Sequence, residues 1–244
     1  MPPMKHTTLV MVVFGAALAA TLNIPVRAQQ AAAPAPAARD RANAAPAPPR
    51  ARPTLFFREE WKQQTPPENP DLPVSQQYVR NPALELKLYG PAGKDLVITG
   101  RDNDPQNPTH VWTGLCASTC AMTLRDKANF VDLTGQAKAR WVTKVSGFHQ
   151  IHPIVKLADG TFLAGDVGHG SRTDWVETEF YFADVRWAKL DPARVVTTGP
   201  MLDKVDLSKV DEFGWTDLMP SSGHGQGGWS DVGKIELYGK AVPR

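Results

Sequence analysis

Short segments in which apolar and polar residues alternate constrain the fold of this chain more than any other feature. Residues 84–89 read Leu-Glu-Leu-Lys-Leu-Tyr, and residues 139–145 place Trp141, Thr143 and Val145 on one face. A period of two residues is typical of a half-buried β-strand. Seven more segments read as strands, whereas no long segment has a helical period: 95–99, 151–158, 161–164, 175–182, 185–190, 212–218 and 234–238.

The spacing of these segments predicts one all-β domain over residues 54–244. Asp159-Gly160 separates two of the predicted strands, and this pair of residues is a strong signal for a hairpin turn. Nine short strands separated by turn residues favour a β-sandwich with the topology of a jelly roll.

The first 28 residues have the features of a signal peptide. Lys5 and His6 precede an apolar run at 9–22, and Val26 and Ala28 fit the small residues before a cleavage site after Ala28. A membrane anchor is the alternative, but a membrane-spanning helix needs about 20 apolar residues. We therefore expect an exported protein, periplasmic or secreted, that is not inserted in a membrane after cleavage.

Residues 29–53 read as a disordered linker. Eleven of these 25 residues are Ala and six are Pro, so the segment has almost nothing to bury. The first 53 residues also hold 6 of the 27 Lys and Arg but 1 of the 25 Asp and Glu, which leaves a net charge of −3 on residues 54–244. That balance argues against nucleic acid as a partner.

The two cysteines, Cys116 and Cys120, are expected to form a local disulfide, since an exported protein meets an oxidising compartment. Free thiols and a metal-binding pair remain alternatives, and the spacing of the two residues fits a zinc pair although the sequence has no second pair.

Three stretches resemble a known fold family. Residues 131–135 (Val-Asp-Leu-Thr-Gly), 206–215 and 229–239 are similar to three strand-forming motifs of the galactose-binding-like jelly rolls found in carbohydrate-binding modules. The resemblance covers roughly residues 125–240, and the chain is also similar to exported bacterial proteins. It implies a glycan ligand, but a fold does not by itself imply a function.

Loop placement selects the residues that we expect to bind such a ligand. The glycine-rich stretch 220–229 would present His224 and Trp229, and Trp112 is likewise flanked by loop residues. A Trp face can stack on the apolar face of a sugar ring, and an imidazole can bond its hydroxyl groups. His149 and Asp166 are expected as further polar partners. Plugs at the ends of the sandwich are the alternative role for both tryptophans.

Metal sites are weaker candidates. Asp102 and Asp104 in one loop could hold a structural calcium ion through carboxylate oxygens. A transition-metal site would need three ligands, drawn from His149, His152, His169, Asp166 and Asp174. Histidines that are simply buried or exposed explain the same pattern.

We therefore expect non-catalytic glycan binding, with two alternatives. The first is a secreted hydrolase or lyase acting on polysaccharides, for which Glu177 and Glu179 share one strand face but also fit a solvated face. The catalytic residues of such an enzyme are not identifiable from the sequence. The second is a structural or interaction protein of the cell envelope, which the Ala/Pro linker would suit equally well.

Overall fold

The computed structural model describes residues 52–64, 72–218 and 227–244, and these form two β-sheets. Sheet A contains, in spatial order, β11 (Arg172–Tyr181), β8 (Lys138–Gly147), β15 (Gly228–Tyr238), β5 (His110–Trp112), β4 (Val97–Thr99) and β2 (Leu72–Pro73), with β1 (Leu55–Glu59) also paired to β15. Sheet B contains β13 (Val196–Leu202), β12 (Trp187–Asp191), β10 (Phe162–Gly165), β9 (Gln150–Leu157), β14 (Val210–Leu218), β6 (Cys120–Asp126) and β3 (Leu84–Tyr89), with β7 (Asn129–Asp132) paired to β14 and to β16 (Lys240–Pro243).

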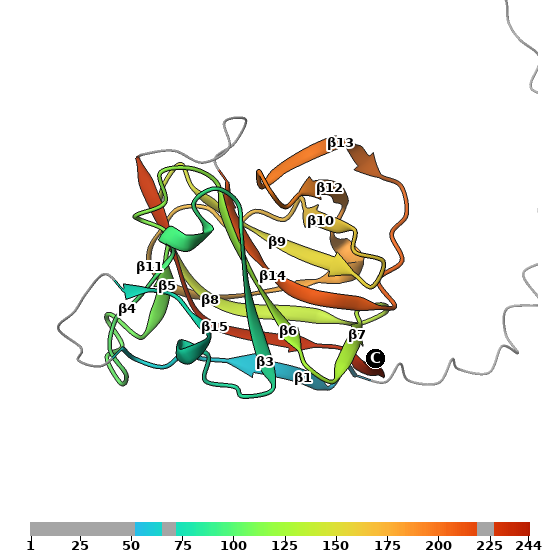
Figure 1. Ribbon diagram of the computed structural model, residues 1–244, viewed down its shortest axis with the longest axis horizontal. Helices are drawn as coiled ribbons and strands as arrows, with labels where there is room; N and C mark the ends of the chain where they lie inside the picture. Colours follow the sequence, from blue (N-terminus) through green and yellow to red (C-terminus); the bar gives the residue numbers. More distant parts are fainter. Residues whose placement is uncertain (1–51, 65–71, 219–226) are drawn as a thin grey trace, which may run out of the picture. The chain divides into compact units, whose positions relative to one another are not determined.

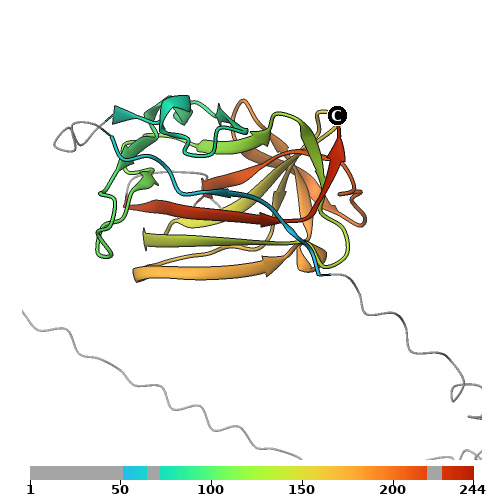
Figure 2. The ribbon, with the colours of Figure 1, turned by 90° about the horizontal axis from the view of Figure 1, so that it is seen from below.

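The two sheets pack as a sandwich, as the sequence predicts. Every pairing between named strands is antiparallel. The chain crosses repeatedly from one sheet to the other, which is the connectivity of a jelly roll, and the long strands lie in two layers (Figure 1, Figure 2). The helical elements are single turns: η1 (Gln76–Tyr78), η2 (Gly93–Asp95) and η3 (Phe182–Asp184).

Aromatic side chains fill the space between the layers. Trp141 from β8 stacks on Phe213 from β14, with ring centroids 6.2 Å apart, and Phe182 meets Phe213 edge-on at 5.6 Å. All three side chains are fully buried. Large rings bury the most apolar area per residue, so these contacts between the sheets are a main source of the sandwich's stability.

The structure confirms the clearest sequence patterns. Along β8 the residues alternate between buried and partly exposed, and Trp141, Thr143 and Val145 face the core. The hairpin at Asp159-Gly160 joins β9 to β10, and Gly160 adopts a φ of +89° that favours glycine.

β6 was not predicted from the sequence, because its residues do not alternate between apolar and polar. The first five residues of β6, from Cys120 to Leu124, are all buried, since a second, smaller apolar cluster covers part of the outer face of sheet B. A strand buried on both faces reads as a continuous apolar run, which periodicity cannot distinguish from a buried helix.

Both ends of the described domain lie at the same end of the sandwich. The amide of Gly239 donates to the carbonyl of Thr54 at 3.0 Å, next to the start of β1. The other end of β15, at Gly228 and Trp229, lies 11 residues away along the strand. No helix among the described residues is long and apolar enough to cross a membrane.

Candidate functional site

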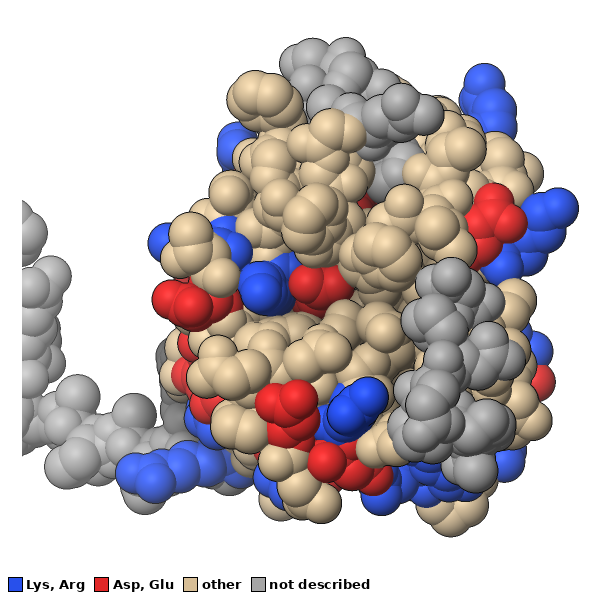
Figure 3. Space-filling view, turned by 90° about the vertical axis from the view of Figure 1, so that its left-hand side faces the viewer, with Lys and Arg blue, Asp and Glu red and all other residues tan. Residues whose placement is uncertain are grey.

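A hollow of about 300 Å³ lies on the outer face of sheet A, the face turned away from the core. We call it the aromatic hollow because three tryptophans line it. Its lining residues come from β4, β5, β8, β11, β15 and the loop before β5: Thr99, Asn107, His110, Trp112, Lys144, Trp175, Trp229 and Asp231. Figure 3 shows the side of the molecule that lies at the left in Figure 1, where uncharged side chains cover much of the described surface.

Strand register brings three of these residues into one row. Asp231 of β15 is paired with Trp112 of β5 on one side and with Lys144 of β8 on the other. Directly paired residues point to the same face of a sheet. Their sequence neighbours Val111, Val145 and Val232 are buried in the core, so the row itself must face outward.

A buried polar pair forms the base of the hollow. His110 and Asp231 are 4% and 5% exposed, and their Nε2 and Oδ1 atoms lie 3.2 Å apart. The other ring nitrogen, Nδ1, donates to the carbonyl of Pro108 at 2.6 Å. With both ring nitrogens engaged, the imidazole is fixed in place. The imidazole makes a T-shaped contact with Trp175, and the two ring centroids lie 4.9 Å apart.

The orientation of Trp112 depends on a glycine two residues later. A Cβ atom on Gly114 would lie 1.9 Å from Cζ2 of the Trp112 ring, far inside contact distance. The indole therefore lies directly over the backbone at Gly114, which only glycine permits.

Trp175 and Trp229 complete the aromatic walls. The indole N–H of Trp175 donates to the carbonyl of Gln106 at 3.2 Å, which ties the ring to the loop before β5. Trp229 is 40% exposed, an unusual exposure for a side chain of this size. The hollow thus combines aromatic side chains with the ammonium group of Lys144, the amide of Asn107 and the hydroxyl group of Thr99. This combination suits a ligand that has both apolar and hydroxylated faces.

Of the predicted binding residues, the structure brings Trp112 and Trp229 together in this hollow. His224 lies outside the described residues. Trp175 and His110, which also line the hollow, were not predicted from the sequence to belong to this site. The strict alternation in His110-Val111-Trp112 was the available signal, because it places His110 and Trp112 on one face of a strand.

His149 is a correction to the sequence prediction. Its side chain is fully buried on the core side of Gly228, and Nδ1 lies 2.8 Å from Oδ1 of the equally buried Asp217. Thr113 donates to the same carboxylate at 2.7 Å. His149 is therefore part of a buried polar network and cannot serve as a surface contact for a ligand.

Asp166 also lies apart from the aromatic hollow. Its carboxylate accepts hydrogen bonds from the backbone and the guanidinium of Arg186, at 2.9 and 2.7 Å. Burial alone would raise the pKa of Asp166, but these bonds outweigh it and hold the pKa below its usual value. The structure gives Asp166 a role in anchoring Arg186 and does not join it to Trp112 and Trp229.

The predicted disulfide is a second correction. Cys116 and Cys120 are both buried, and no disulfide joins them. Their thiols are hydrogen-bonded to each other, and the Cys116 thiol also donates to the carbonyl of Ala92 at 3.5 Å. The bond to Cys116, together with burial, raises the pKa of Cys120 well above its usual value. The protonated thiol is therefore favoured, and it is the unreactive form.

The two calcium candidates already have partners within the chain. Asp102 pairs with Arg80 and accepts from Thr109, and Asp104 accepts from the backbone amides of Gln106 and Asn107. Within the described ranges there is no group of three or more His, Cys, Asp or Glu residues arranged to hold a metal ion. Calcium at this loop stays a prediction.

The remaining candidate histidines, His169 and His152, form hydrogen bonds with groups in the interior of the domain. His169 Nδ1 accepts a hydrogen bond from the indole N–H of the core residue Trp141 at 2.6 Å. His152 Nδ1 donates to the carbonyl of Gly165 at 3.1 Å. Burial lowers the pKa of both rings, so the neutral form is favoured.

Comparison with known proteins gives structural likenesses only. No family model matches the sequence, and no curated protein matches it either. The family 11 carbohydrate-binding module of the cellulosomal cellulase Lic26A-Cel5E of Clostridium thermocellum is 14% identical, with 65% of this chain and 88% of that module covered and a TM-score of 0.39. TmCBM61 in complex with β-1,4-galactotriose is 12% identical, with coverages of 64% and 88% and a TM-score of 0.35. An exo-β-agarase is 9% identical, with 67% of this chain and 24% of that chain covered and a TM-score of 0.36.

Proposed function

We propose that this chain binds a glycan in the aromatic hollow and releases it unchanged. The observation that carries the proposal is the convergence of Trp112, Trp175 and Trp229 from three strands around the Asp231 row. Indole rings that line a hollow beside fixed hydrogen-bonding groups match a sugar ring, which has apolar C–H faces and a rim of hydroxyl groups.

The arrangement favours binding through stacking. Buried aromatic anchors usually carry most of the free energy of an interface, while surrounding polar groups give specificity. Trp175 is held by a hydrogen bond from its indole N–H and by its T-shaped contact with the His110 ring, so little conformational entropy is lost when a ligand covers it.

The test is isothermal titration of the full chain with a panel of neutral oligosaccharides that includes β-1,4-galactotriose and a β-1,3-1,4-mixed-linked tetrasaccharide. We expect Trp175→Ala and Trp229→Ala each to weaken binding on the order of tenfold or more. Tyr181→Ala is the matched control, since Tyr181 is an exposed aromatic residue on the same strand as Trp175 but outside the hollow. Unchanged affinity in both Trp variants would refute the proposed site.

Product analysis tests whether binding is catalytic. Bound oligosaccharides incubated with the chain should be recovered intact, whereas shortened or unsaturated products would show a hydrolase or lyase.

We propose further that the chain acts outside the cytoplasm. The apolar run at 9–22 and the residues up to Ala28 carry this proposal. Expression of the full chain in a bacterial host should yield an exported product whose N-terminus, read by intact mass, is Gln29. An uncut N-terminus in the cytoplasmic fraction would contradict it.

A further inference from the structure

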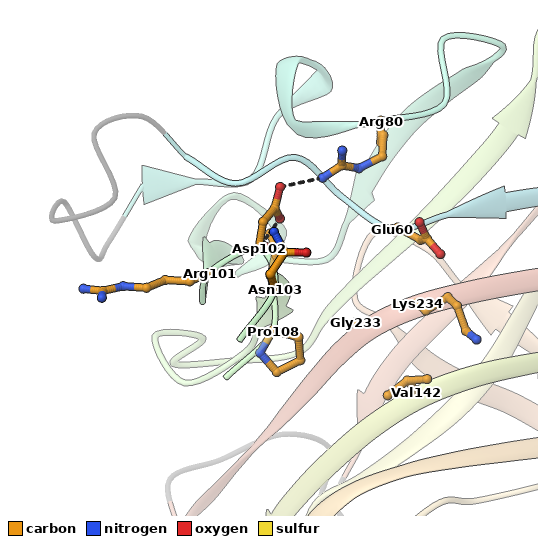
Figure 4. A pocket seen from close by; sticks show the side chains of 10 residues that line it. Glu60, Arg80, Arg101, Asp102, Asn103, Pro108, Val142, Gly233 and Lys234 are labelled. Carbon is orange, nitrogen blue, oxygen red and sulfur yellow. Dashed lines mark hydrogen bonds and ion pairs between the residues drawn. The ribbon is translucent and has the colours of Figure 1, made fainter. Parts of the chain in front are cut away.

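A second hollow, of about 560 Å³, lies next to the aromatic hollow on the same face of sheet A. We call it the polar hollow. Arg80 and Asp102 line one side of it, and Glu60 and Lys234 line the other (Figure 4). Thr109 is also part of the lining.

The two hollows continue along the same strands. On β15, the residues Trp229 and Asp231 line the aromatic hollow and Gly233 lines the polar one. On β8, Lys144 lines the first and Val142 the second. Val142 and Lys144 are two residues apart on β8 and therefore share a face. On β15 the pairing with β8 shifts between Val232 and Ile235, and Gly233 and Lys234 both line the polar hollow. Four residues of β15 span about 13 Å, which is longer than a single sugar ring.

Gly233 keeps the floor open between the hollows. A Cβ atom at Gly233 would lie 3.7 Å from the ring of Trp175, 3.9 Å from the carbonyl oxygen of Thr109 and 3.6 Å from that of Val142. These are ordinary van der Waals contacts, so a methyl group fits there, but a larger side chain would rise into the groove. The Trp175 ring, which lines the aromatic hollow, therefore lies next to Gly233, which lines the polar hollow.

A preorganised ion pair forms one wall of the polar hollow. The guanidinium of Arg80 donates through Nε to the carbonyl of Trp61 at 2.7 Å and through one terminal nitrogen to Asp102 at 2.9 Å. The other carboxylate oxygen of Asp102 accepts from Thr109 at 2.6 Å. Both side chains are nearly half exposed, so their free donor and acceptor positions face solvent in a fixed geometry.

The charges in the polar hollow are balanced. Arg80 pairs with Asp102 inside the hollow. Glu60 and Lys234 pair with residues outside the lining, Glu60 with Arg58 at 3.8 Å and Lys234 with Glu177 at 2.7 Å. The Arg101 side chain points away from the other lining residues (Figure 4). A donor beside an acceptor, without excess charge, suits neighbouring hydroxyl groups better than a phosphate or a carboxylate.

We propose that the two hollows form one groove that binds an internal stretch of an uncharged polysaccharide chain. One sugar unit stacks in the aromatic hollow, and a later unit of the same chain bonds to the Arg80–Asp102 pair across Gly233. This inference rests on the proposed function and names the class of its ligand: a chain of several neutral units rather than a single terminal sugar.

The test is the dependence of affinity on chain length. The full chain is titrated with neutral oligosaccharides, from disaccharide to hexasaccharide, of the type that binds best in the panel. We expect affinity to rise at least about tenfold over the series, since hydrogen bonds to charged groups are the stronger ones. Added salt should leave this rise unchanged.

Two glycine variants locate the rise in the groove. Gly233→Leu should abolish the gain of the longer chains and leave disaccharide affinity close to that of the wild type. Gly233→Ala, which fits the available space, should retain the gain and serves as the matched control. Thermal unfolding of both variants checks that the fold is kept. If Gly233→Leu does not fold, Asp102→Ala takes its place and should likewise abolish the gain in affinity of the longer chains.

The outcomes separate the two proposals. If disaccharides bind and Trp175→Ala weakens them, but affinity does not rise with chain length or Gly233→Leu leaves the rise intact, the groove is refuted and the aromatic site stands. If charged oligosaccharides bind more tightly than neutral ones of equal length, the ligand class is wrong. If no glycan of any length binds, both proposals fail.

Discussion

At the scale of single residues, the side chains that the sequence suggests as ligand contacts have different roles in the structure, depending on whether they are buried. Trp112 and Trp229 were predictable as binding candidates, because both stand beside loop residues. His149 was not predictable as a buried residue, because its partner Asp217 lies 68 residues away in the sequence. The alternation of apolar and polar residues predicts the face of the strand on which a side chain lies. It does not predict which residue from a distant part of the sequence contacts that side chain.

Gly114 offers the sharpest test of how Trp112 is oriented. Gly114→Ala would place a methyl group inside the indole ring, so the ring must move. We expect glycan affinity to fall about as much as in Trp112→Ala, while the unfolding free energy changes by about 1 kcal/mol or less, because the ring lies at the surface. Titration and urea unfolding measure the two effects. Wild-type affinity in Gly114→Ala would show that the ring position does not matter.

At the scale of elements, alternation predicted the strands that have one exposed face, such as β8. It did not predict β6, which is buried on both faces, or β13, which is mostly exposed. The order of the strands within each sheet could not be predicted from the sequence either. The aromatic hollow exists because β15 lies between β5 and β8, and that pairing joins residues more than 80 positions apart.

The buried pair between His149 and Asp217 joins neighbouring parts of the fold, and Thr113 from the loop after β5 ties it to sheet A. His149→Ala would remove the imidazole that pairs with the buried Asp217 carboxylate, while the hydrogen bond from Thr113 stays in place. We expect this variant to lose about 3 kcal/mol of unfolding free energy. Phe148→Ala, at a neighbouring residue that is 75% exposed, should lie within about 0.5 kcal/mol of the wild type. Equal stability of the two variants in urea unfolding would contradict a structural role for the pair.

At the scale of the whole molecule, the stability of the fold should depend on pH through its interior histidines. His152 and His169 have pKa values below 6.5 in the folded chain, with burial as the first cause. The unfolded chain therefore binds more protons than the folded one as pH drops below about 6.5. Unfolding free energy should be fully retained above that pH and decline as pH falls toward the lowered pKa values.

Urea unfolding between pH 7.5 and pH 5 measures this dependence. The decline should begin well above the range in which the paired carboxylates lose stability, because carboxyl groups such as Asp166 and Asp211 titrate below their usual value of 3.8. A His152→Asn and His169→Gln double variant should have a flatter profile between pH 6.5 and pH 5. An unchanged slope in that variant would exclude these histidines as the source.

Glycan binding at Trp112, Trp175 and Trp229 can be followed through the indole N–H signals of the full chain in a ¹⁵N–¹H NMR titration. With a bound neutral oligosaccharide, the signals of these three residues should shift the most. Those of the buried residues Trp61, Trp141, Trp187 and Trp215 should remain nearly in place. Saturable binding that leaves the three hollow signals unmoved would place the ligand elsewhere and contradict the account.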